Sequence, residues 1–223
     1  MWIIRRFLLI PLALALACLA FLPKAQALCR EGCDTPSANT FLGDDALLYN
    51  TGFGNTAVGD HALYSNTTSS DNTATGVNAL YYNTGNYNTA HGYQALESNT
   101  TGTNNTANGL NALNKNTTGS SNAANGAYAL YSNTTASNNM AHGYKALYSN
   151  LSGSFNTADG ELALYKNTSG YNNTASGVNA LYANTIGARN IALGYSAGFS
   201  LTTGSNNIDI GTLGLLPRPT RSA

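Results

Sequence analysis

An internal repeat that runs through most of the chain is the strongest constraint on its fold. Between Asn39 and Gly211 the pattern Asn-Thr-Ala-x-Gly-x-x-Ala-Leu-Tyr-x-Asn-Thr-x-x-x-x returns every 17 residues and, twice, every 16. Ten coils open at Asn39, Asn55, Asn72, Asn88, Asn105, Asn122, Asn139, Asn156, Asn173 and Asn190, and a partial eleventh opens at Asn207. Self-similarity at a fixed short period is typical of stacked units. Any function should therefore reside in rows of repeated groups rather than in a single pocket.

The first 27 residues form a separate segment. Arg5 and Arg6 precede an apolar stretch from Phe7 to Leu22, and Ala25-Gln26-Ala27 is a small-x-small cleavage site. This order is typical of an export signal that is removed after Ala27. We therefore expect a secreted or cell-surface protein.

Two alternatives exist for this segment. A membrane anchor would need roughly 20 apolar residues, whereas the uncharged run is only about 16 residues long and contains Pro11. A lipoprotein would need acylation of Cys18, whose preceding residues suit that chemistry only loosely. We expect no stable membrane span after the signal is cleaved.

Charge excludes one class of partner. Once the signal is removed, seven basic residues remain against ten acidic ones, which gives a net charge of −3. No basic patch is left for nucleic acid. Charged residues make up only 9% of the chain, so Asn, Thr, Ser and Tyr must wet the surface. Such a surface offers hydrogen bonds rather than a long-range field.

Residues 28–38 precede the repeats as a cysteine-containing cap or linker, and residues 212–223 follow them as a tail. In an exported chain, Cys29 and Cys33 are candidates for a disulfide. The bond could close a local loop or join neighbouring chains, and the spacing leaves both open. Two thiolates with no nearby third ligand do not predict a zinc site.

A glycine recurs at the same place in every coil. This placement fits a turn that needs positive φ, or a backbone contact too close for a Cβ atom. The predicted turn glycines are Gly43, Gly59, Gly76, Gly92, Gly109, Gly126, Gly143, Gly160, Gly177, Gly194 and Gly211.

The length of the repeat favours β structure. Helical-pair repeats, the alternative, usually need about 33 residues or more. Asn and Gly are rare in isolated strands, but identical coils stacked roughly 4.8 Å apart let Asn side chains hydrogen-bond along a ladder. We therefore predict an all-β parallel β-solenoid of about ten coils, each of 16 or 17 residues, over residues 39–211.

The predicted core is thin and consists mainly of one leucine and two alanines in each coil. Burying a leucine contributes roughly 1.5–3 kcal/mol, whereas ordering each residue costs about 1–2 kcal/mol. A single column looks marginal on this basis, so we expect the Ala-Leu stripes of several chains to pack together in a homo-oligomer. The predicted core leucines are Leu47, Leu63, Leu80, Leu96, Leu113, Leu130, Leu147, Leu164 and Leu181.

The segment Asn190-Ile191-Ala192-Leu193-Gly194-Tyr195-Ser196-Ala197-Gly198 resembles the head repeats of trimeric autotransporter adhesins, the YadA-like heads. Asn207-Ile208-Asp209-Ile210-Gly211 repeats the frame, and Asn-Thr-Ala-x-Gly repeats are also similar to those of phage tail fibres. The resemblance implies a left-handed β-roll, a homotrimer, and binding to surfaces or to matrix proteins such as collagen. Most coils depart from the family by placing Thr and a polar residue around the small residue, and no heptad stalk or barrel segment follows.

Motifs for chemistry are weak. Gly194-Tyr195-Ser196-Ala197-Gly198 matches a nucleophile elbow, which needs a strand-turn-helix setting with a His and an acid. That context is missing here, and the Gly and Ala of the motif are the standing residues of the repeat. His91 and His142 share one repeat position three coils apart, too far apart for one chain to close a metal site. We expect no enzymatic activity, no cofactor and no metal.

Function is expected in the repeated polar faces. The leading hypothesis is a structural or adhesive surface protein whose Asn/Thr/Tyr-rich face binds a matrix protein, a host surface or a glycan. The alternative is ice binding by a threonine ladder. The threonines of this row are Thr56, Thr73, Thr89, Thr106, Thr157 and Thr174, and Ala123 and Met140 interrupt it.

Overall fold

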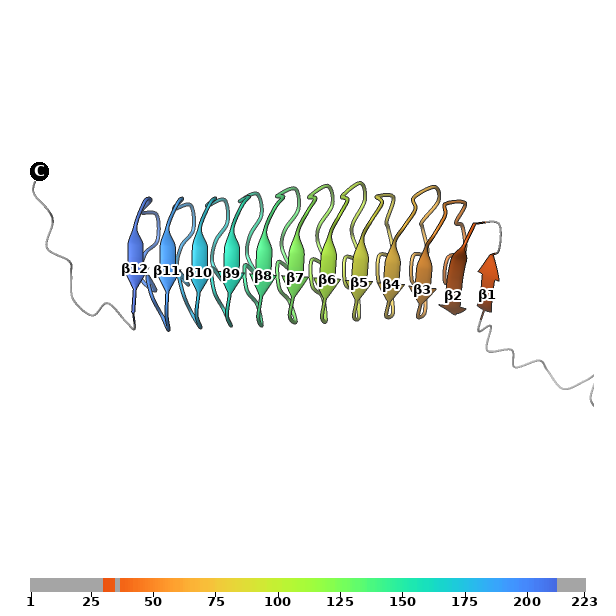
Figure 1. Ribbon diagram of the computed structural model, residues 1–223, viewed down its shortest axis with the longest axis horizontal. Coiled ribbons are helices and arrows are strands. Elements are labelled where there is room, and N and C mark those ends of the chain that lie inside the picture. Colours follow the sequence, from red (N-terminus) through yellow and green to blue (C-terminus); the bar gives the residue numbers. More distant parts are fainter. Residues whose placement is uncertain (1–29, 35–36, 212–223) are drawn as a thin grey trace, which may run out of the picture.

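The computed structural model describes residues 30–34 and 37–211. Within these ranges the protein is all-β, and its twelve strands form one sheet in chain order (Figure 1). β1 (Arg30–Asp34) pairs antiparallel with β2 (Asn39–Gly43), and all later neighbours are parallel. The later strands are β3 (Thr56–Val58), β4 (Thr73–Thr75), β5 (Thr89–His91), β6 (Thr106–Asn108), β7 (Ala123–Asn125), β8 (Met140–His142), β9 (Thr157–Asp159), β10 (Thr174–Ser176), β11 (Ile191–Leu193) and β12 (Ile208–Ile210).

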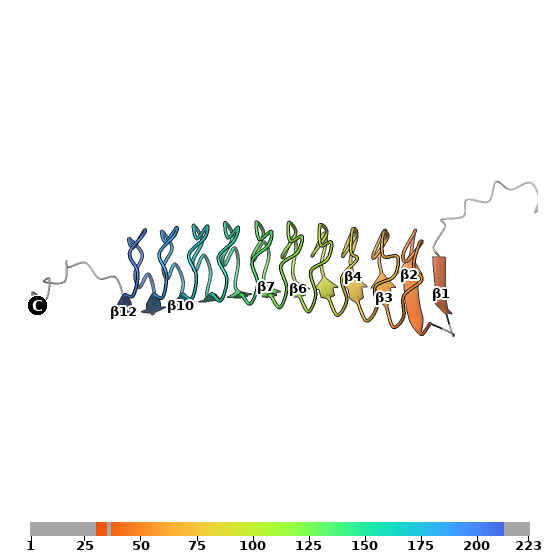
Figure 2. The same cartoon turned by 90° about the horizontal axis from the view of Figure 1, so that it is seen from above.

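Each coil contributes one short strand and returns through an arm without regular secondary structure. The strands lie along one side of the body and the returning chain lies on the other (Figure 2). The predicted parallel β-solenoid of about ten coils is therefore confirmed.

Backbone hydrogen bonds join neighbouring coils along the strand, the returning arm and the second turn alike. In the coil of Asn105, the Thr106 amide donates to Asn122 O (2.8 Å), Leu113 to Ala129 O (3.0 Å) and Thr117 to Thr134 O (2.9 Å). The neighbouring coil thus supplies the partners that a buried backbone requires.

The recurring glycines occupy a turn that only glycine fits. All eleven have φ between +121° and +144°. A Cβ atom on Gly109 would lie 2.7 Å from the backbone carbonyl of Gly126 in the next coil. Both the backbone angle and the close stacking of coils therefore require glycine here.

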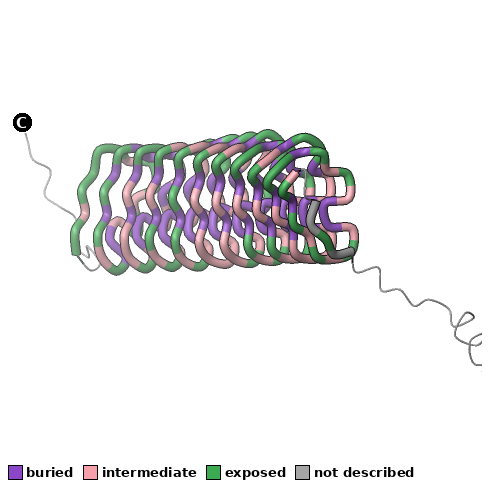
Figure 3. Tube along the Cα trace, turned by 45° about the vertical axis from the view of Figure 1, so that its right-hand side comes forward, coloured by how far each residue is buried: buried purple, intermediate pink, exposed green. Residues whose placement is uncertain are grey.

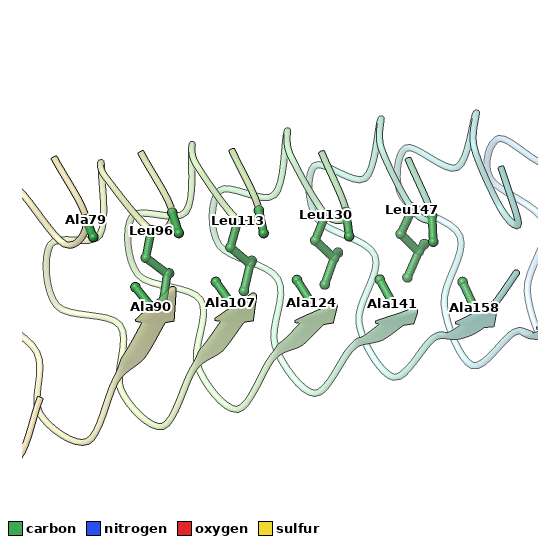
Figure 4. Packing of buried hydrophobic residues seen from close by; sticks show 14 of the residues in the cluster. Ala79, Ala90, Leu96, Ala107, Leu113, Ala124, Leu130, Ala141, Leu147 and Ala158 are labelled. Carbon is green, nitrogen blue, oxygen red and sulfur yellow. The ribbon is translucent and has the colours of Figure 1, made fainter. Parts of the chain in front are cut away.

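The core is enclosed by a single chain. Ala107 of β6 faces Ala112 and Leu113 of the returning arm, and all three are fully buried, as are their counterparts in the neighbouring coils. Figure 4 shows the leucines reaching toward the strand alanines, and Figure 3 shows the buried trace inside the exposed turns. The expectation that Ala-Leu stripes pack between chains is wrong, because this apolar surface is already removed from water within each chain.

Left-handed backbone explains how such a narrow coil closes around its own core. Successive side chains of an extended strand point to opposite faces, yet Ala112 and Leu113 are both fully buried. Leu113 has φ +52°, and the leucines at this position in the neighbouring coils have closely similar values. This conformation is rare for a bulky residue, and it turns both side chains inward.

Two asparagine ladders run along the interior. In the first, which begins at Asn39, Asn105 Oδ1 accepts from the backbone amide of Asn122 (3.0 Å). In the second, Asn116 Nδ2 donates to Asn99 Oδ1 (2.7 Å) and to Gly119 O (2.9 Å). The ladders satisfy polar groups that would otherwise be unpaired in the dry interior.

The second ladder stops near the C-terminal end of the stack. Leu201 occupies the position where the next asparagine would stand, and it packs against the apolar core instead. Asn184 Oδ1 is consequently left without a hydrogen-bond partner among the described residues.

The two ends of the stack differ from its middle. β1 lies against β2 with antiparallel pairing, so it covers the edge that β2 would otherwise offer to another strand. At the other end Asp209 replaces the strand alanine, and its carboxylate accepts from the amide of Gly198 (2.8 Å). The expected export signal and the tail from residue 212 lie outside the described residues.

Candidate functional site

The outward side of the strands forms the first candidate surface, which we call the strand face. It carries the first and third residues of β3 to β12 and, in register with them, Thr40 and Leu42 of β2, so that Thr40 belongs to the first-residue row. The central alanine of β3 to β11 points inward. The first-residue row holds five threonines in uninterrupted register: Thr40, Thr56, Thr73, Thr89 and Thr106. Sequence reasoning omitted Thr40, although its place directly after Asn39 marks it as a member of the row. Ala123 and Met140 interrupt the row, as the sequence indicates.

The second row of the strand face is chemically mixed. Asn108 Nδ2 donates to Asn125 Oδ1 (2.7 Å), and His142 Nδ1 lies 3.1 Å from Asp159 Oδ1. His91 and His142 are exposed in different coils. The row thus presents amides, imidazoles and carboxylates rather than one repeated group.

The opposite side of the stack carries the second candidate surface. We call it the tyrosine face, and it consists of the outward residues between each turn glycine and the following ladder asparagine. The ring that stands five residues after the glycine stacks on its counterpart in the next coil: Tyr131, Tyr148, Tyr165, Tyr182 and Phe199 form a continuous stack. Neighbouring ring centroids are 5.1–5.3 Å apart. Sequence reasoning noted a frequent tyrosine in each coil but missed this stack, which the fixed repeat position could have revealed.

A shorter stack lies nearer the N-terminal end of the tyrosine face. Tyr64 and Tyr81 stack at 5.0 Å between centroids. Glu97 and Asn114 hold the next two positions, and Asn114 Nδ2 donates to Glu97 Oε2 (2.9 Å). This polar pair separates the two aromatic stacks.

Lysines accompany the longer stack. Lys115 Nζ lies 4.9 Å from the ring centroid of Tyr131, and Lys145 Nζ lies 5.0 Å from that of Tyr144. A hydrogen bond with Tyr144 raises the pKa of Lys145 above its ordinary value. Cations above tyrosine rings are electrostatically favourable, so this half of the face is positively charged and aromatic.

A hollow of about 400 Å³ lies on the tyrosine face near the N-terminal end. Asp60, His61, Asn78, Tyr81, Tyr82 and Glu97 line it. His61 Nδ1 is 2.6 Å from Asp60 Oδ1, and His61 Nε2 is 3.8 Å from Asp45 Oδ2. This half of the face combines carboxylates with aromatic rings.

Tyr64 is expected to titrate at unusually high pH. Its hydrogen bond with the Tyr49 hydroxyl, followed by desolvation, raises the pKa of Tyr64 from 10.0 to about 12. Because the folded value is the higher one, the stabilisation is fully present below pH 10 and is lost as the pH rises toward 12. NMR titration of tyrosine rings should show one late resonance that Tyr49→Phe moves to lower pH. The distant Tyr87→Phe should leave it unchanged, and a Tyr64 that titrates near pH 10 in the unaltered protein would contradict this assignment.

The weaker sequence motifs acquire places in the fold. Ser196 is buried at a repeat position with φ +54°, and its backbone amide donates to Val178 O (2.8 Å). Cys29 lies outside the described residues, and only the backbone of Cys33, within β1, is described.

In residues 30–34 and 37–211, no group of three His, Cys, Asp or Glu side chains is arranged to hold a metal ion. The same ranges contain no helix with the length and apolarity needed to cross a membrane.

Comparison of the chain with protein-family models, with curated proteins and with solved structures finds no match.

Proposed function

We propose that this protein is an exported, non-enzymatic surface module that adheres to a glycan, a host surface or an extended matrix protein through its strand face. The observation that carries the proposal is the straight array of outward rows on β2 to β11. These rows repeat hydroxyl and amide groups at roughly 4.8 Å, the spacing of neighbouring strands. A polymer lying along the stretch from Thr40 to Thr106 meets a hydroxyl group at each step.

Repetition supports adhesion because many weak contacts act together. A single surface hydrogen bond contributes about 0.5–1.5 kcal/mol, but linked contacts on one polymer become effectively intramolecular and their combined affinity rises steeply. The likeness of Asn190–Gly198 to adhesin head repeats points in the same direction. Left-handed winding, which that likeness implies, belongs to the proposal as well; the likeness also implies a trimer, which is an alternative to pairing of two copies. The shared Ala-Leu core no longer supports assembly, so association would have to use the outer faces.

Ice binding is the second candidate, and the five uninterrupted threonines from Thr40 to Thr106 favour it. A regular threonine row can order water on a flat sheet. The neighbouring row, however, contains His91 and Asn108, and Met140 later breaks the threonine row. Adhesion tolerates this mixture better than recognition of a crystal lattice does.

Binding to immobilised glycans and matrix proteins tests the function. The double variant Thr73→Arg/Thr106→Arg adds two bulky charges to the strand face and should weaken binding at least tenfold. Thr101→Arg/Thr135→Arg adds the same charges to exposed turns and is the matched control. We expect no thermal hysteresis from the unaltered protein. Equal binding by both variants would exclude the strand face, whereas thermal hysteresis without surface binding would replace adhesion by ice binding.

A further inference from the structure

Charges are segregated along the tyrosine face. We number the coils from one, beginning with the coil that opens at Asn39. From residue 37 to residue 114 every charged side chain is acidic, and the first lysine after residue 37 is Lys115. On the tyrosine face the acids Asp44, Asp45, Asp60 and Glu97 lie in coils one, two and four. The lysines Lys115, Lys145 and Lys166 lie in coils five, seven and eight, with Glu161 as the single acid among them.

This order is self-complementary under a two-fold axis. Let the axis lie in the plane of the face, across the stack, between coils four and five. It then places coil four opposite coil five, coil two opposite coil seven, and coil one opposite coil eight of a second copy. Every acidic coil meets a lysine coil. A parallel pairing would instead set each acid against its own counterpart.

The positions within the arm agree with this register in two of the three coil pairs; in the third, Glu161 of coil eight lies on the same edge as Asp44 of coil one, and Lys166 lies on the other edge. A two-fold axis of this kind keeps each edge of the face against the same edge of the partner. Asp60 stands one residue after the turn glycine of its coil, and Lys145 stands two residues after its own. Glu97 stands five residues after its turn glycine, and Lys115 stands six. Asp60 of one copy therefore lies on the same edge as Lys145 of the other, and Glu97 lies on the same edge as Lys115. The two-fold symmetry forms each of these two pairs twice.

Exposed aromatic rings lie between these charges. Tyr82, Tyr93 and Tyr144 are each about half exposed. In this register coil three, with Tyr82 beside the hollow, faces coil six with its ring Tyr131. Aromatic residues are enriched at protein interfaces, and a fitting partner would remove these rings from water.

We propose that two copies of this chain associate antiparallel through their tyrosine faces, with Lys145 of each copy directed toward the hollow formed by Asp60, Tyr81, Tyr82 and Glu97 of the other. The overlap covers eight coils, or about 38 Å at one strand spacing per coil. The contact is a narrow strip, so the dimer is weak and depends on its charges. Both strand faces remain on the outside, which makes the dimer bivalent for any ligand of those faces.

Sedimentation analysis over a concentration series tests the dimer. The unaltered protein should reach twice the monomer mass at low salt, and added salt should raise the dissociation constant at least tenfold. Arg189→Glu, outside the tyrosine face, is the control and should leave association unchanged. A monomer at every concentration, or a trimer, would overturn the proposal.

A charge exchange tests the register and guards against misfolding. One variant carries Lys115→Glu and Lys145→Glu, and the other carries Asp60→Lys and Glu97→Lys. Each alone should be monomeric with an unchanged circular dichroism spectrum. Their mixture restores an opposite charge at all four pairings and should form a heterodimer. Dimers that persist in the single variants, or a mixture that stays monomeric, would refute the assignment.

Discussion

Replacing Gly109 by alanine is expected to destabilise the solenoid by about 4 kcal/mol or more, which is exceptional for one methyl group. Two effects combine. Gly109 has φ +137°, a region that costs a side-chain-bearing residue about 1–3 kcal/mol. In addition, the new Cβ would lie 2.7 Å from both C and O of Gly126 and 3.0 Å from the amide nitrogen of Ala127. All three of these atoms belong to the backbone rather than to a flexible side chain, so the coils themselves must separate.

Gly211→Ala is the matched control for this substitution. Gly211 has φ +128°, but nothing lies within 4 Å of the Cβ position. It should therefore show only the backbone strain of about 1–3 kcal/mol. Urea unfolding followed by circular dichroism measures both variants. Equal losses would mean that close stacking contributes nothing and that the φ angle alone selects glycine.

Asn105→Ala is expected to cost about 1.5–4.5 kcal/mol. The buried Asn122 amide is left unpaired, at about 1–3 kcal/mol, and Gly119 O, which keeps its bond from Asn116 Nδ2, loses a second hydrogen bond of about 0.5–1.5 kcal/mol. Asn105 is fully buried. Its Nδ2 donates to Gly119 O (2.9 Å), and its Oδ1 accepts from the Asn122 amide (3.0 Å). The Asn122 residue is buried as well, so the loss is larger than that of an ordinary surface hydrogen bond.

Asn108→Ala provides the comparison on the strand face. Asn108 is half-buried, and its side chain donates only to Asn125 Oδ1. Its replacement should cost about 0.5–1.5 kcal/mol. Chemical denaturation of the two variants gives the difference directly. Comparable losses from Asn105 and Asn108 would show that the inner ladder has no special role.

Residues that recur without change made much of this architecture predictable. Asn105, Gly109 and Leu113 each have an identical counterpart one coil away, so each has to suit a shared environment. The Asn ladders, the glycine turn and the leucine column all follow from that reasoning. Period alone also separates this fold from helical repeats, because 17 residues are too few for a helical pair.

Two features lay beyond the sequence argument. The conformational preference of leucine does not predict that Leu113 adopts φ +52°. Alternation along an extended chain instead predicts that one side chain of each Ala-Leu pair points outward. The shared core was predicted from the small apolar content of each coil, and it is incorrect because one chain encloses that content fully. The tyrosine stack was missed for another reason: Glu97 and Asn114 interrupt it, and a variable position is easily interpreted as solvent-facing. Stacking becomes evident only when the coils are placed in register.

The left-handed residues also bear on how the chain reaches this structure. Each of the eight coils that open between Asn55 and Asn173 contains three non-glycine residues of this kind, such as Asn111, Leu113 and Ser121 in the coil of Asn105, and each opposes its own local preference. A lone coil has no neighbour whose hydrogen bonds offset that cost, so a first coil is a poor nucleus. A coil added to an existing stack meets a complete template at once. Folding should therefore proceed as growth from an established end, with the hairpin of β1 and β2 as the local contact from which growth can start.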